Sequence, residues 1–196
     1  MLLAGWALPA AADTLSYVIL KEGEPIGHET VSLTRSGERS QVHVVTETRV
    51  KVLFVNFHFS HRRDESWVGA SLEQMVSDTD DDGDIHHLEV HRDARSVQLE
   101  VDGQHRQVSA DALPLCQWTR AILDHPQLYS VIDAAPYAVT VTDLGPETVA
   151  LAGRQVTAEH YHMAGGTVRE LWYGADGLLV KTTFERRGYP IAVVRE

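Results

Sequence analysis

The chain has 196 residues, of which 43% are hydrophobic, so it can bury the core of one soluble domain without disulfide staples. Its formal charge is −11, from 28 acidic against 17 basic residues, and no basic stripe offsets this charge locally. A charge of this sign repels phosphate backbones and anionic membrane surfaces, so no nucleic acid partner is expected.

The N-terminal twelve residues carry no charge, and the first lysine is Lys21. An apolar run that ends in Ala10 to Ala12 before Asp13 is typical of a secretory signal peptide, although the basic start of such a peptide is missing. We predict that residues 1–12 are a signal peptide truncated at its start, and that 13–196 form a single β-rich domain, periplasmic or secreted. The alternatives are a frayed hydrophobic terminus or a short anchor. The run is too short to span a bilayer, and no transmembrane segment is expected in the mature chain.

Alternating apolar and polar residues, the period of a β-strand, recur along most of the chain. Examples are Val31 and Leu33, then Val97, Leu99 and Val101, and later Leu178, Val180 and Phe184. Turn signals separate these runs, among them Asp82-Gly83 and Asp102-Gly103, and Asp-Gly pairs tolerate the positive φ angles of tight hairpin turns. The pattern predicts a series of antiparallel hairpins.

Between Val42 and Phe59 the apolar positions change from even to odd numbers near Leu53 and Phe54. Within one continuous strand such a change of face requires a bulge or a bend. We therefore expect a sheet that curls over its core.

Only residues 112–132 depart from alternation. Leu115, Trp118 and Ile122 have helical spacing, and Pro114 suits a first helical turn. The predicted fold class is thus mainly β, a curled antiparallel sheet (a β-roll or an unclosed barrel) wrapped around one short helix.

Several stretches resemble an uncharacterised family of secreted bacterial proteins, a domain of unknown function. They are "YVILKEGEPIGHETVSL", "ESWVG" with "DTDDDG" after it, "LGPETVALAGRQVTAEHYHM" and "ELWYGADGLLVKTTFERRG". The resemblance covers most of the chain after residue 15. Related envelope proteins are curled sheets, spiral rolls or unclosed barrels around a helix, and some are thought to hold lipids. The resemblance therefore implies such a fold and a hydrophobic ligand.

The window "DTDDDGDIHHLE", residues 78–89, fits the pattern of an EF-hand calcium loop. The ligands would be Asp78, Asp80, Asp82, the backbone of Asp84, and Glu89. Strand-like patterns on both sides favour a different interpretation, in which Asp82-Gly83 closes a solvated hairpin and Glu89 lies too far from the tip to bind the ion. On the favoured hairpin interpretation no cofactor is expected, and calcium is the ion that the window would bind if it formed a loop.

Histidine is frequent, with 11 copies, and His160 and His162 fall on one face of a strand, a workable pair for zinc or copper. Most histidines in such patterns are polar residues of a strand face. Cys116, the single cysteine, has neither a catalytic base nor an oxyanion-hole motif beside it, and its apolar neighbours favour a buried thiol.

Large aromatic residues are the candidates to line the interior of a curled sheet. They are Phe57, Phe59, Trp67, Trp118, Trp172 and Phe184. They form either a packed core or part of a cavity for an acyl chain or another apolar ligand.

The favoured function is a non-enzymatic periplasmic envelope protein that binds a lipid-like or other hydrophobic ligand. The alternative is a structural or protein-interaction module of the cell envelope, with calcium at the acidic window. A metal- or thiol-dependent enzyme comes third, with Cys116 or the histidines as its reactive groups.

Overall fold

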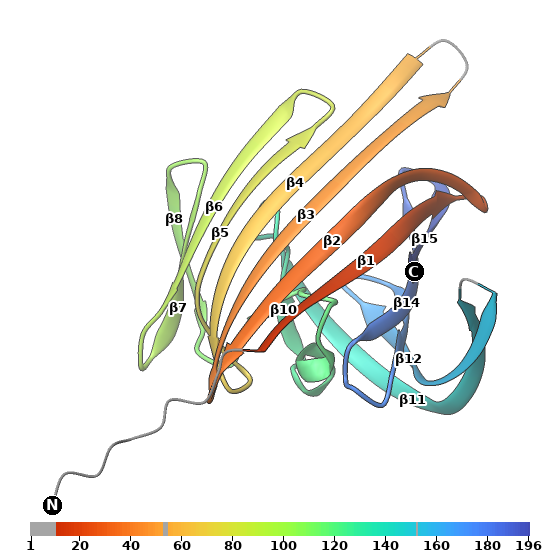
Figure 1. The fold of residues 1–196 in the computed structure, drawn as a ribbon. Helices are drawn as coiled ribbons and strands as arrows, with labels where there is room; N and C mark the ends of the chain where they lie inside the picture. Colours follow the sequence, from red (N-terminus) through yellow and green to blue (C-terminus); the bar gives the residue numbers. More distant parts are fainter. Residues whose placement is uncertain (1–10, 53–54, 152) are drawn as a thin grey trace, which may run out of the picture.

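The computed structural model describes residues 11–52, 55–151 and 153–196, which form fifteen β-strands and one short 3-10 helix (Figure 1). The strands are β1 (Ala11–Lys21), β2 (Glu24–Ser36), β3 (Arg39–Val52), β4 (Val55–Val68), β5 (Ser71–Asp81), β6 (Asp84–Arg92), β7 (Ser96–Val101), β8 (Gln104–Ser109), β9 (Leu113–Pro114), β10 (Gln127–Tyr129), β11 (Pro136–Leu151), β12 (Arg154–Gly165), β13 (Arg169–Tyr173), β14 (Leu179–Arg186) and β15 (Tyr189–Arg195).

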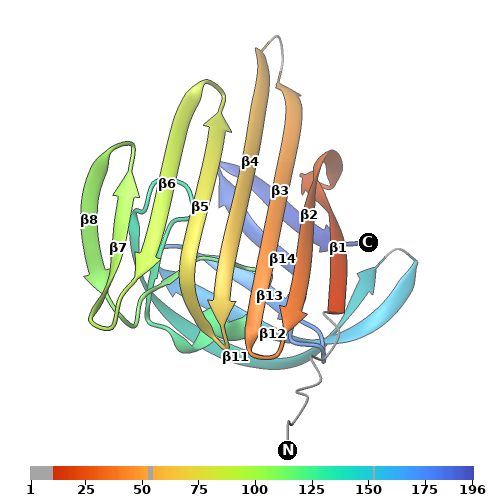
Figure 2. The same ribbon diagram turned by 60° about the vertical axis from the view of Figure 1, so that its left-hand side comes forward.

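All these strands belong to one sheet, in the order β8-β7-β6-β5-β4-β3-β2-β1-β15-β14-β13-β12-β11-β10-β9. Neighbours are antiparallel, except that β9 and β10 are parallel. The sheet bends so that one wall (β2–β5) faces a second wall (β12–β14), with β1 and β15 between them (Figure 2). Arg186 of β14 reaches across and donates a hydrogen bond of 2.7 Å to Asp81 of β5. The predicted curled, unclosed antiparallel sheet is therefore confirmed.

Alternation explains the bend, because nearly every strand has one apolar face to bury. Val31 and Leu33 of β2 belong to the same buried cluster as Leu171 of β13 and Leu179 of β14 on the facing wall. A smaller cluster around Trp172 lies on the opposite face of β13, since Trp172 alternates with the core residues on either side of it.

The Asp-Gly turns have the predicted backbone conformation. Asp82 and Gly83 have φ angles of 63° and 97°, and Asp102 and Gly103 have φ angles of 52° and 77°. Two consecutive positive φ angles characterise the tight turn whose twist matches that of a hairpin. These pairs join β5 to β6 and β7 to β8.

The predicted helix is wrong. In place of about ten helical residues, the segment forms a 3-10 helix at Arg120–Asp124, and the described part of the chain contains no α-helix. Both flanks are held in extended pairing, because β9 pairs with β10 and the Leu115 N–H donates to the Tyr129 carbonyl at 2.9 Å. The three residues with helical spacing are buried, but they belong to an interior loop, residues 115–126, and not to an α-helix.

The expected bulge at Leu53 and Phe54 lies outside the described residues. The strand around it is not continuous, however, because β3 ends at Val52 and β4 begins at Val55, and these two residues pair with each other. The change of face thus corresponds to a reversal of the chain direction.

No helix within the described ranges has the length and apolar character that crossing a bilayer would require.

Gly27 is a site where two backbones approach closely. A Cβ atom at this position would overlap the Glu47 carbonyl oxygen and lie 2.7 Å from the Thr48 Cα. We expect Gly27→Ala to lower the free energy of unfolding by between about 1 and 3 kcal/mol in urea denaturation. His28→Ala, at the exposed neighbouring position, is the matched control. An unchanged midpoint for Gly27→Ala would contradict the close packing of β2 on β3.

Candidate functional site

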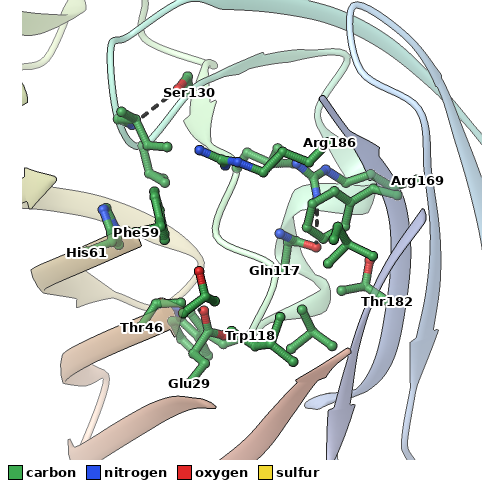
Figure 3. Close-up of a pocket in the computed structure, with 18 of the residues that line it drawn as sticks. Glu29, Thr46, Phe59, His61, Gln117, Trp118, Ser130, Arg169, Thr182 and Arg186 are labelled. Atoms are coloured by element: carbon green, nitrogen blue, oxygen red, sulfur yellow. Dashed lines mark hydrogen bonds between the residues drawn. The ribbon is translucent and has the colours of Figure 1, made fainter. Parts of the chain in front are cut away.

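A cavity of about 230 Å³ lies between the two facing walls (Figure 3). The strands β1–β4, the strands β13–β15, the segment 115–132 and the start of β11 contribute to it. The lining side chains are Ile19, Ile26, Glu29, Thr46, Thr48, Phe59, His61, Arg63, Leu115, Gln117, Trp118, Ser130, Val131, Ile132, Tyr137, Arg169, Leu179, Thr182, Phe184, Arg186, Ile191 and Val193. The cavity thus combines apolar walls with a minority of polar and charged groups.

Strand β4 directs a row of polar side chains inward. His61, Arg63 and Glu65 are 5%, 6% and 2% exposed, and Trp67 continues the row. A search of the sequence for apolar lining residues does not find these three polar side chains. Continuing the odd-numbered alternation of Phe57 and Phe59 through position 67 would have found them, because every second residue of a strand shares a face.

The Glu65 carboxylate accepts hydrogen bonds from four side chains. Arg63 Nε and Cys116 Sγ donate to Oε1, the latter at 3.1 Å. The indole N–H groups of Trp67 and Trp118 donate to Oε2 at 2.6 and 2.9 Å. A buried charge is tolerated when it is paired and hydrogen-bonded in this way. The carboxylate joins β4 to the interior loop.

His61 is a neutral imidazole in the folded protein. Its Nε2 lies 3.0 Å from Arg63 Nη1 and so accepts, while its Nδ1 lies 2.8 Å from Thr79 Oγ1 and donates. Burial, with the positive charges of Arg63 and Arg186, lowers the pKa of His61 to about 3. Burial opposes the charge on Arg63 itself, but Glu65, Cys116 and Glu29 together outweigh this effect and raise the Arg63 pKa above its usual value.

Glu29 of β2 is the other acidic group of the cavity wall. It accepts a hydrogen bond of 2.8 Å from Thr46 Oγ1 on the neighbouring strand β3. Burial raises the pKa of Glu29, and the nearby charge of Arg63 only partly opposes this.

On the facing wall, two arginines stack on aromatic rings. The Arg169 guanidinium carbon lies 4.2 Å from the centre of the Phe184 ring, and that of Arg186 lies 4.5 Å from the centre of the Phe59 ring. Arg169 also donates a long hydrogen bond of 3.4 Å to the Gln117 side chain. Figure 3 shows Arg169, Gln117 and Thr182 gathered on this side of the cavity.

The predicted aromatic lining is only partly brought together. Trp118 and Phe184 line the cavity. Trp67 lies behind it, edge-on to Trp118 with ring centres 5.7 Å apart. Trp172 packs on the other face of the sheet, and the Phe57 ring lies 5.8 Å from the Arg187 guanidinium, away from the lining.

The acidic window forms two antiparallel strands with a turn at Asp82-Gly83, not the continuous loop that an EF-hand requires. Glu89 pairs with Val76, well down β6 from the turn. Of the other candidate ligands, Asp80 accepts from the Gly83 N–H at 2.8 Å, and Asp78 and Glu89 both contact His87, at 2.7 and 3.2 Å. Asp84 is exposed at the start of β6.

His160 and His162 do share a face of β12, outside the cavity, but both contact acidic residues. His160 Nδ1 lies 3.0 Å from Glu147, and its Nε2 lies 2.8 Å from Glu170. His162 Nδ1 lies 2.7 Å from the second Glu170 oxygen. Within residues 11–52, 55–151 and 153–196, no group of three or more His, Cys, Asp or Glu side chains is arranged to hold a metal ion.

Cys116 is fully buried, as expected of a packed thiol. Burial, reinforced by the adjacent Glu65 charge, raises the pKa of Cys116 well above its usual value. The thiolate, which is the nucleophilic form, is therefore disfavoured.

These observations define the protein as an open, barrel-like β-protein with a mixed apolar and polar cavity between its walls. The model of a family defined by a domain of unknown function, DUF6134, matches residues 17–196, so the chain belongs to the DUF6134 family.

The same architecture occurs in the crystal structure of a beta-barrel-like protein of the domain of unknown function DUF1849 from Brucella abortus. The two chains align with a TM-score of 0.64 over 97% of this chain and 96% of the other, at 10% sequence identity, a likeness that shows the fold alone. No curated protein matches the sequence.

The Glu65 contacts predict a large effect of removing its charge. We expect Glu65→Gln to lower the free energy of unfolding by about 3–5 kcal/mol, because the Arg63 guanidinium would remain buried without its counter-ion. Urea denaturation measures the change, and Glu73→Gln at an exposed position of β5 is the control, expected within about 0.5 kcal/mol of wild type. A loss for Glu65→Gln no larger than that of the control would refute this role.

His61 predicts a pH dependence of stability. The folded protein keeps His61 neutral down to about pH 3, whereas the unfolded chain protonates it near 6.5, so this stabilisation is complete above pH 6.5 and is lost as the pH falls. Between about pH 7 and about pH 5, wild type should lose roughly 2 kcal/mol more than His61→Asn. His105→Asn, whose side chain is 81% exposed, should keep the wild-type slope. Coincident slopes for wild type and His61→Asn would contradict the neutral buried ring.

Proposed function

We propose that this protein is a non-enzymatic binding protein of the bacterial cell envelope that holds a small hydrophobic or lipid-like molecule between the walls of its sheet. The proposal rests on the cavity between the two walls. The cavity is partly open to solvent and has a volume of about 230 Å³, a space that close-packed protein interiors seldom leave unfilled. About half of its lining residues are apolar, and the others are polar or charged groups that can fix the orientation of a ligand, as in small-molecule sites generally.

The volume limits the size of the ligand. An apolar cavity of about 150 Å³ accommodates benzene, whereas sites for drug-sized molecules begin at about 300 Å³. The occupant is therefore a short amphiphile, or one end of a longer chain that leaves past Arg186, whose side chain is 36% exposed. A whole membrane lipid is too large.

The proposed location is the periplasm, supported by the apolar, uncharged N-terminal sequence that ends in small residues. The stability of the described fold does not depend on disulfides, since the chain has a single cysteine, which is buried and free. Such a protein can fold in an oxidising compartment without the risk of mispaired cysteines within the chain.

The cavity also favours ligand binding over the alternative of a pure protein-interaction module, because a module of that kind gains nothing from a void in its core. The chemistry of Cys116 supports a non-enzymatic role, because burial and the hydrogen-bonded Glu65 carboxylate both raise the pKa of its thiol and so disfavour the nucleophilic thiolate.

Filling the cavity should weaken ligand binding. Thr48 of β3 lines it, whereas the adjacent Glu47 is exposed on the other face of the strand. Calorimetric titration with 1-octanol should show one binding site in wild type and in Glu47→Trp. The affinity of Thr48→Trp for 1-octanol should be at least about tenfold lower (about 1.4 kcal/mol).

Native mass spectrometry of protein taken from the periplasmic fraction of its host cell is the complementary measurement. A co-purifying small molecule is expected in wild type and not in Thr48→Trp. Absence of the protein from that fraction would overturn the location, and equal octanol binding by all three proteins would overturn the site.

A further inference from the structure

Three guanidinium groups line the cavity, and their partners differ. Arg63 pairs with the Glu65 carboxylate. Arg186 pairs with Asp81, at a distance of 2.7 Å between Nη2 and Oδ2. Arg169 contacts no carboxylate within hydrogen-bonding distance in the described part of the chain; its side-chain hydrogen bond is the one of 3.4 Å to the neutral amide of Gln117.

The Arg169 guanidinium is also incompletely hydrogen-bonded. Its Nε is buried and has no partner. Burial lowers the pKa of Arg169 to about 10, which still leaves the group charged at neutral pH. A buried cation without a counter-ion is costly, and such a group at a cavity wall is satisfied when an anion enters.

A second polar atom lacks a partner in the same region. Thr182 is 1% exposed, and its hydroxyl oxygen has no hydrogen-bond partner. It lies beside Arg169 in Figure 3, on the neighbouring strand β14. Two unsatisfied groups on one cavity wall mark the place where a polar ligand atom would sit.

We infer that the ligand carries a single anionic oxygen group, a carboxylate, which binds to the Arg169 guanidinium and accepts a further hydrogen bond from the Thr182 hydroxyl. This inference rests on the proposed function. The apolar body of the ligand then lies against Ile191 and Val193 of β15 and Leu179 of β14, which line the same cavity.

The charge balance favours a carboxylate over a phosphate. The planar guanidinium fork matches either group. Arg169 supplies one positive charge without a carboxylate partner, and the second charge of a phosphate would face Glu29 across the cavity. The overall charge of −11 adds to the cost of a dianion.

The test compares three probes with the same chain length, namely octanoate, 1-octanol and octyl phosphate, by calorimetry at neutral pH. Wild type should bind octanoate at least about tenfold more tightly than 1-octanol, consistent with a charge-assisted bond of about 1.5–3 kcal/mol. Octyl phosphate should bind more weakly than octanoate.

Three variants assign the preference to a residue. Arg169→Met removes the charge but keeps an unbranched side chain that can pack on Phe184, and this variant should bind octanoate and 1-octanol equally. Arg169→Lys should retain part of the preference, because it keeps the charge but loses the fork. Arg186→Met, the matched control, should retain the full preference. Melting curves check the fold: octanoate should raise the Tm of wild type more than that of Arg169→Met.

The outcomes separate the two proposals. If wild type binds neither octanoate nor 1-octanol, the proposed function fails and this inference with it. If both bind with equal affinity, or if Arg169→Met is folded and keeps the preference for octanoate, the function stands and the carboxylate assignment is overturned. Tighter binding of octyl phosphate than of octanoate also overturns it.

Discussion

The structure depends on one buried carboxylate. Glu65 lies on the inner face of β4, where a charge is tolerated only because Arg63, Cys116, Trp67 and Trp118 all donate to it. Two of these donors belong to the strand and two to the interior loop. Because that loop has little secondary structure of its own, its position over the sheet is determined largely by such contacts. The loop in turn supplies part of the cavity wall, so the carboxylate stabilises both the fold and the site.

The cavity reflects a conflict between stability and binding. A sheet that used only apolar residues on its inner face would pack more tightly, and replacing buried charges with apolar groups is often stabilising. This protein instead keeps His61, Glu29 and Arg169 on the wall of its cavity. Function is expected at sites that depart from the rules of a stable interior. The free-energy cost of desolvating Arg169 without a counter-ion is recovered only when an anionic ligand binds to it.

Strand periodicity and turn chemistry were sufficient to predict the sheet, because both are local. Asp82-Gly83 specifies its hairpin through backbone angles alone, and the same local argument placed Glu89 away from the turn. The interior loop was misread, since Leu115, Trp118 and Ile122 have helical spacing whether they pack from a helix or from a loop held at both ends. The polar wall formed by Arg169 and Thr182 could not be predicted, because these residues meet through the pairing of β13 with β14 and face strands more than a hundred residues away.

The pairing of β1 with β15 also constrains when the protein can fold. Tyr17 to Lys21 pair with Ile191 to Arg195, so the centre of the sheet joins the first strand to be synthesised with the last. Contacts of such long sequence separation form slowly, and the bend that brings the walls together cannot be completed before β15 is available. During synthesis the sheet therefore stays open until β15 can pair with β1. The topology that creates the cavity thus also delays its closure.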